Sequence, residues 1–196
     1  AFANECFMDE LAEKAGKDPA QFRLDLLPKS SRDARVIKRV MEKSGWDNFN
    51  IGFDGSNYQG ISCHKSFGTW VAQVARVSVK GNKVKVHEIH CAVDCGIVIN
   101  PSIVTAQISG AIIYGLSATL KSKITIKNGR VVQSNFDDFE VLRMNETPEI
   151  HVYLIESDEP PSGVGEPGLP PTAPAVVNAI FAATGKRIRE LPVQLS

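Results

Sequence analysis

The chain has 196 residues, 43% hydrophobic and 22% charged, and its 22 basic and 22 acidic residues cancel to a formal net charge of zero. This composition can supply a hydrophobic core, which excludes a disordered chain. The absence of a basic excess argues against a nucleic-acid-binding protein. No apolar run approaches the roughly 20 residues of a membrane span, so we expect none.

The first 46 residues predict a helical segment. A first helix ends at Gly16, a second starts at Asp18-Pro19 with an N-cap and a first-turn proline, and a third covers residues 31–44 before Gly45. The spacing of four and five residues predicts that one apolar stripe of the first helix comprises Phe2, Phe7, Leu11 and Ala15. The Asn-, Asp- and Gly-rich residues 47–57 predict a loop that forms the boundary with the following portion.

From residue 57 onward the pattern indicates an α+β portion that extends to residue 196. A period of two predicts strands at residues 60–67, 70–79 and 84–93, with a hairpin turn at Gly81-Asn82. A second hairpin is predicted from residues 124–127 and 131–134, followed by a strand at 150–156. We therefore expect an α+β fold with N-terminal helices, an antiparallel or mixed sheet and a long helix packed on it.

That long helix is predicted at residues 102–120, behind the cap Asn100-Pro101. Gly110 and Gly115 lie inside it and each costs roughly 1 kcal/mol relative to alanine. Glycines at such a cost indicate close approach of another backbone or of a ligand. A final helix is predicted at residues 172–184, ending at Gly185.

One carboxylate stands out in the loop Gly163-Val164-Gly165-Glu166-Pro167-Gly168. The glycines allow positive φ and close approach to a ligand, and the following prolines stiffen the segment. Poor hydration on a tight apolar loop raises the pKa of a carboxyl group, which suits a general base near neutral pH. The alternative is a solvated turn with an incidental acid.

The cysteines and histidines do not predict a zinc site. His87, His90, Cys91 and Cys95 lack the usual C-x-x-C pairs, and neighbouring strand residues such as His90 and Cys91 point to opposite faces. We expect all four cysteines to be free, and we assign no metal ligand. A Ser/His/Asp triad is equally unsupported, because the chain has no G-x-S-x-G motif.

Several motifs, taken together, are similar to those of a known family. The Gly-Val-Gly-Glu-Pro loop is preceded by Cys91-Ala92-Val93-Asp94-Cys95-Gly96 and by Gln107-Ile108-Ser109-Gly110. In this order they resemble the C-terminal part of the molybdopterin-binding large subunit of the xanthine dehydrogenase/aldehyde oxidase family, and most of all its isoquinoline 1-oxidoreductase beta-subunit branch. The resemblance extends from Asn4-Glu5 to Leu191-Pro192.

The resemblance implies roles for individual residues. Glu166 matches the family's catalytic glutamate, the base in a reaction that inserts oxygen from water. Gln107 matches a glutamine of the cofactor pocket, and its amide suits the edge of a pterin. Gly110 and Gly165 are the further cofactor-binding candidates. The Asp94-Cys95-Gly96 turn and the acidic stretch 135–139 match segments near the cofactor, although a plain turn explains each equally well.

The resemblance also implies a function for a longer protein. Family subunits are several times longer, so we expect the chain to be a fragment of a molybdenum hydroxylase that oxidises an aldehyde or an N-heteroaromatic substrate. Its cofactor would be molybdenum with molybdopterin in the dinucleotide form. Its partners would be the N-terminal remainder of the subunit and a small iron–sulfur subunit or domain. The alternative is a structural module without activity. We expect the fragment alone to lack cofactor and turnover and to self-associate through uncovered surfaces.

Overall fold

The computed structural model describes residues 1–46 and 58–195, so the loop predicted at residues 47–57 lies outside the described residues. The helices are α1 (Phe2–Lys14), α2 (Pro19–Asp25), α3 (Arg32–Ser44), α4 (Pro101–Leu120) and α5 (Thr172–Thr184), with a short 3-10 helix η1 (Met144–Glu146). The strands are β1 (Tyr58–Ser66), β2 (Thr69–Lys80), β3 (Lys83–Asp94), β4 (Ile126–Lys127), β5 (Arg130–Val131) and β6 (Glu149–Leu154).

The main sheet is mixed and has the strand order β1-β2-β3-β6. The first three strands form an antiparallel meander, whereas β6 pairs in parallel with β3 from Glu88↔Glu149 to Val93↔Leu154. A parallel neighbour requires a long crossover, and the segment that contains α4 provides it. The expected α+β class with a mixed sheet is confirmed.

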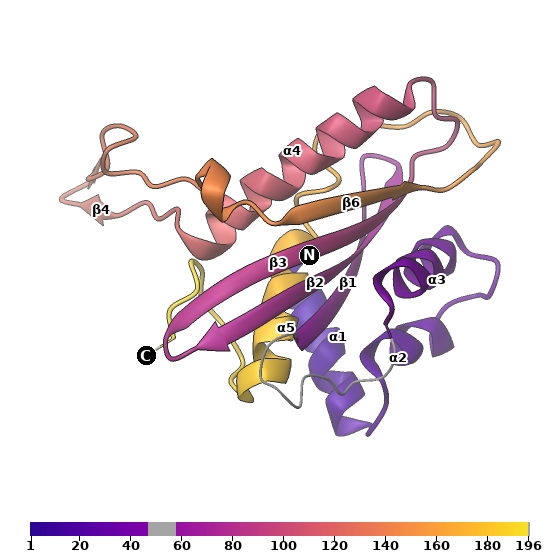
Figure 1. Cartoon of the computed structure of the whole chain (residues 1–196), viewed down its shortest axis with the longest axis horizontal. Coiled ribbons are helices and arrows are strands. Elements are labelled where there is room, and N and C mark those ends of the chain that lie inside the picture. Colours follow the sequence, from indigo (N-terminus) through magenta and orange to yellow (C-terminus); the bar gives the residue numbers. More distant parts are fainter. Residues whose placement is uncertain (47–57, 196) are drawn as a thin grey trace.

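Helices cover both faces of this sheet (Figure 1). On one face, α5 and α4 pack against alternate residues of β2 and β3, including Val71, Ile89 and Val93. On the other face, α2 and α3 pack against the intervening residues, such as Ala72 and Val74. Alternate residues of the strands thus contribute to two hydrophobic cores, one on each side of the sheet.

Helix α5 rests directly on β1. A Cβ atom on Gly60 would lie 2.1 Å from the backbone nitrogen of Ala179, so only glycine permits this approach. The buried Asn178 side chain donates to the carbonyl oxygen of Ile61 at 3.1 Å. Helix α4 joins the same layer by packing on α5 and beside β6.

The expectation that no segment is long and apolar enough to span a membrane is wrong for α4. Its 20 residues are long and apolar enough to cross a membrane by length and composition, because no charged residue interrupts them. Ser, Thr and Gln are scattered along this helix, so no uninterrupted apolar run marks it in the sequence. In this fold Val104, Ile108, Ile112 and Leu116 are buried in the core on one side of the helix.

The predicted apolar stripe of α1 is also wrong. Phe7 is 57% exposed and Leu11 is 38% exposed, whereas Glu5, Cys6, Asp9 and Ala12 form the buried side. The buried acids are neutralised from elsewhere in the chain: Arg23 Nε lies 3.0 Å from Glu5 and Arg187 lies 2.6 Å from Asp9. Ion pairs with residues distant in sequence therefore outweigh the apolar spacing that suggested the stripe.

The second hairpin is present but shorter than predicted. Only Ile126–Lys127 and Arg130–Val131 are paired, on either side of the Asn128-Gly129 turn. Both strands are exposed on both faces, and the hairpin extends away from the main sheet in Figure 1. Without a packed face, backbone pairing does not spread along the predicted strands.

Candidate functional site

The loop that carries Glu166 connects β6 to α5 and is anchored at its start by the β1–β2 turn. The backbone N–H of Gly163 donates to the carbonyl oxygen of Phe67 at 3.1 Å. The hydroxyl of buried Thr69 donates to the carbonyl oxygen of Gly163 at 2.7 Å. A Cβ atom on Gly163 would lie 3.1 Å from Cβ of Phe67, so a small residue is needed here.

The other end of the loop is anchored by α4 and by a buried amide. A Cβ atom on Gly168 would lie 2.9 Å from the carbonyl oxygen of Ile108 and 3.2 Å from Cβ of Ala111. The fully buried Gln73 donates to the carbonyl oxygen of Gly168 at 2.6 Å. The Thr172 hydroxyl, at the start of α5, lies 2.9 Å from that oxygen and 3.0 Å from Gln73 Oε1.

Glu166 itself lies between these two anchors and is exposed. Its carbonyl oxygen accepts from Leu169 N–H at 2.8 Å, which closes a turn. The glycines of this loop do not use the positive φ that glycine allows, because Gly163, Gly165 and Gly168 are not among the residues with positive φ. Close packing, rather than a left-handed backbone, is what requires Gly163 and Gly168.

The predicted cofactor residues of α4 lie on its exposed side. Gln107 and Gly110 are both exposed, and a Cβ atom on Gly110 would meet nothing within 4 Å. The same helical turn contacts the glutamate loop through Ile108 and Ala111. Gly115 is different, because a Cβ atom there would lie 3.0 Å from Cβ of Thr172. Close approach of backbone therefore explains Gly115, while Gly110 faces open space.

The structure brings the loop and the α4 turn together, but it does not join their polar side chains. Among the described residues, no hydrogen bond links Glu166 to Gln107. Gly165 has open space around its Cα, with nothing within 4 Å of a Cβ atom built there. The result is an open edge that offers one carboxylate, one amide and two uncovered glycines.

The Asp94-Cys95-Gly96 turn has a structural role. Asp94 is completely buried, with Arg35 at 2.8 Å and Arg32 also bonded to its carboxylate. Gly96 has φ +77°, and its N–H donates to Asp94 Oδ1 at 3.3 Å. Its neighbour Cys95 accepts from Ser162 N–H at 2.9 Å, so this turn supports the segment that leads to Glu166.

The acidic stretch 135–139 is a solvated turn in this chain. The Asp138 carboxylate accepts from the backbone N–H groups of Ser134 and Asn135, and these bonds lower its pKa. Phe136 is 69% exposed. The stretch contacts neither the glutamate loop nor Gln107 through any hydrogen bond among the described residues.

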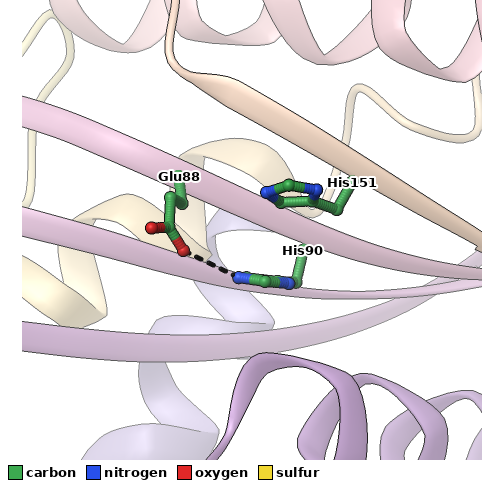
Figure 2. Close-up of side chains that lie close together, drawn as sticks. All are labelled: Glu88, His90 and His151. Carbon is green, nitrogen blue, oxygen red and sulfur yellow. Dashed lines mark hydrogen bonds and ion pairs between the residues drawn. The ribbon is translucent and has the colours of Figure 1, made fainter.

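The four cysteines are free, as expected. Cys91 lies in the core under α5, whereas His90 is on the opposite face of β3, so they do not form a metal site. A different polar cluster, which the sequence pattern did not predict, consists of Glu88 and His90 on β3 and His151 on β6 (Figure 2). The available signal was the repeated tripeptide Glu-Ile-His at residues 88–90 and 149–151.

A groove of about 700 Å³ lies elsewhere, along the first half of β3 and residues 142–149. None of its lining residues belongs to the glutamate loop or to the α4 turn with Gln107. Glu166 lies outside this groove, and its side chain is exposed.

The donor set at that edge fits one part of a pterin cofactor. An exposed glutamine amide can pair with the amide-like edge of a pterin, and the bare glycine backbone permits close approach. These contacts are too few to enclose a whole cofactor. At this edge the described residues therefore offer contacts for only one part of such a cofactor.

Comparisons with known proteins agree with this architecture. The family model described as "Molybdopterin cofactor-binding domain" matches residues 9–148, which include Gln107 and Gly110 but not Glu166. Isoquinoline 1-oxidoreductase subunit beta from Brevundimonas diminuta is 38% identical over 98% of this chain and 25% of its own length. The membrane-bound aldehyde dehydrogenase [pyrroloquinoline-quinone] from Gluconacetobacter polyoxogenes is 36% identical over 97% of this chain and 27% of its own length.

A solved structure shares the fold. The aldehyde oxidoreductase from Desulfovibrio desulfuricans ATCC 27774 is 26% identical, with a TM-score of 0.55 over 63% of this chain and 14% of that chain. The chain spans about a quarter of the length of the two curated relatives described above. Because the family model covers well over half of its residues, the chain belongs to the family of molybdopterin cofactor-binding domains.

Proposed function

We propose that the chain is the C-terminal portion of the catalytic subunit of a molybdenum hydroxylase. Its reaction is the oxidation of an aldehyde or an N-heteroaromatic compound with oxygen taken from water. The names of the relatives support these substrate classes, since they include an isoquinoline oxidoreductase and aldehyde-oxidising enzymes. The molybdenum cofactor, when bound, supplies the two-electron oxidation chemistry.

The observation that carries the proposal is the way the fold presents Glu166. Anchors from the β1–β2 turn, α4 and α5 hold its loop at both ends, yet they leave the carboxylate exposed. A rigidly placed carboxylate that the fold does not use is suited to act as a general base. Water exclusion around it would come from the remainder of the subunit and from the bound substrate.

The residues beside this loop are the proposed cofactor contacts. Gln107 pairs through its amide with the pterin edge, and the uncovered backbones at Gly110 and Gly165 allow the cofactor to approach. We further propose the dinucleotide form of molybdopterin. Its additional contacts lie in the N-terminal remainder, because the described residues offer contacts for only one part of the cofactor.

We propose two partners for this chain. The exposed side of α4 carries Ile103 and Tyr114, which are 58% and 69% exposed, and the N-terminal remainder of the subunit would cover it. A small iron–sulfur subunit or domain would accept the electrons. In isolation the uncovered side would favour self-association. The second candidate function is a structural module that folds but carries no activity.

One experiment tests the proposal in the full-length protein. We expect stoichiometric molybdenum by metal analysis, a pterin absorbance spectrum, and turnover of aldehydes or N-heteroaromatics with a dye as electron acceptor. A quinone spectrum without molybdenum would instead point to the cofactor named for the Gluconacetobacter relative. Absence of molybdenum after expression in a host that makes the cofactor would refute the proposed function.

The 196-residue chain alone should differ from the full-length protein in cofactor content and turnover. We expect the 196-residue chain to fold, with no molybdenum, no pterin and no turnover, because the few contacts it offers do not offset the entropy lost on binding. Stoichiometric cofactor in the isolated chain would show that its own residues enclose the site.

A further inference from the structure

Two copies of one tripeptide lie side by side on β3 and β6. Parallel pairing places Glu88 opposite Glu149 and His90 opposite His151. Residues two apart in a strand point to the same face. Two carboxylates and two imidazoles therefore lie on the sheet face that also carries α3. Figure 2 shows three of these side chains, those of Glu88, His90 and His151.

Three of these side chains lie near one another. Glu88, His90 and His151 each offer one donor atom, and these atoms lie within 4.8 Å of one another. His90 Nε2 is 3.0 Å from Glu88 Oε2, close to the ~3.3 Å that separates two ligands of a tetrahedral zinc ion. The His151 ring is stacked on the His90 ring with the centroids 4.8 Å apart, so it must turn out of this stack to bring its nitrogen to a shared ion, and its 40% exposed side chain has solvent space on one side.

Surrounding groups orient these ligands. His90 Nδ1 lies 2.9 Å from the Tyr153 hydroxyl, which leaves Nε2 directed toward Glu88. Ligating histidines usually hold their second nitrogen in this way. Glu149 Oε2 lies 3.7 Å from His151 Nε2, and Arg76 Nη1 lies 3.2 Å from Glu88 Oε2.

We propose that Glu88, His90 and His151 bind a Zn²⁺ ion that links β6 to β3. Two imidazoles and one carboxylate form a recognised zinc ligand set, with a fourth position left for water. The half-exposed His151 leaves the site open to solvent on one side. The ion would secure β6, an edge strand held to the sheet by a register of only six residues. This site is separate from the molybdopterin edge, so its test is independent of the proposed function.

The test uses the 196-residue chain after removal of metals with a chelator. Titration with Zn²⁺ against a chromophoric zinc indicator should show one equivalent bound, and Zn²⁺ should raise the Tm whereas Mg²⁺ should not. His151→Asn should weaken zinc binding by at least about tenfold, the loss already expected when only an outer partner of a ligand is removed. Glu88→Gln should weaken it likewise.

His64→Asn is the matched control, because His64 lies on β1, outside the cluster. It should bind zinc like the unchanged chain. Circular dichroism confirms that each variant is folded, and His151 was chosen over the buried His90 for that reason. Undiminished zinc affinity in folded His151→Asn, or no stoichiometric uptake by the unchanged chain, would overturn the proposal.

Discussion

Asp94 is the last residue of β3 and Glu166 lies in the segment that connects β6 to α5, and the two carboxylates have opposite environments. Asp94 is completely buried and bonded to Arg32 and Arg35. Glu166 is exposed, and its loop is held by backbone contacts at Gly163 and Gly168 instead. The carboxylate of Asp94 is therefore part of the scaffold, whereas that of Glu166 remains available for chemistry.

Among the variants that test this comparison, we expect the largest effect from Glu166→Gln in the full-length protein. The amide preserves shape but removes the base, so we expect kcat to fall by at least about 100-fold. Steady-state kinetics with a dye acceptor measures this, and metal analysis should show normal molybdenum content. In the isolated chain the same change should alter the free energy of unfolding by no more than about 0.5 kcal/mol.

The control for this variant is Glu156→Gln, an exposed glutamate in the same connecting segment. Its kcat should stay close to that of the unchanged enzyme. Wild-type turnover by Glu166→Gln would contradict the assignment of the base.

The converse variant is Asp94→Asn in the isolated chain. Removing the charge leaves two arginines facing a buried amide, so we expect a loss of about 3 kcal/mol in the free energy of unfolding. Urea denaturation followed by circular dichroism measures it. Asp137→Asn, at an exposed position, should change stability little. If both variants unfolded at the same urea concentration, Asp94 would not have the structural role described.

A smaller effect is expected from Gly168→Ala. The added methyl group would lie 2.9 Å from the carbonyl oxygen of Ile108, so the loop must move away from α4. We expect a loss of roughly 1–3 kcal/mol in the free energy of unfolding. Gly165→Ala is the matched control in the same loop, because its methyl group would meet nothing within 4 Å. Equal thermal stability of the two variants would show that the α4 contact does not hold the loop.

The smallest expected effect belongs to Gln107→Ala in the full-length protein. Exposed Gln107 contributes little to the fold, so we expect molybdenum content or activity to fall while the Tm is retained. Loss of one hydrogen-bonding group is worth about 1 kcal/mol, or a few-fold in occupancy. Gln194→Ala, also exposed, serves as the control. Unchanged molybdenum content and rate would leave Gln107 as a surface residue.

Local patterns in the sequence were sufficient for most of the fold. The strands of the meander and the helices at residues 101–120 and 172–184 follow from alternation, caps and terminal glycines. The hairpin predicted at residues 124–134 is shorter in the structure, because strand pairing there depends on a packed face that its sequence does not supply. The α1 stripe was misassigned, because its buried acids pair with Arg23 and Arg187 from other elements.

The sequence by itself determined the α+β class, the glutamate loop and the family resemblance, since these depend on residue order and local backbone preference. Only the tertiary structure decided that Gly168 packs on α4, that Asp94 is bonded to arginines of α3, and that His90 meets His151. The parallel register of β6 beside β3 brings together side chains that are distant along the chain, and no local pattern encodes such a pairing. Burial and charge neutralisation between distant residues then distinguish Asp94, which supports the fold, from Glu166, which is exposed.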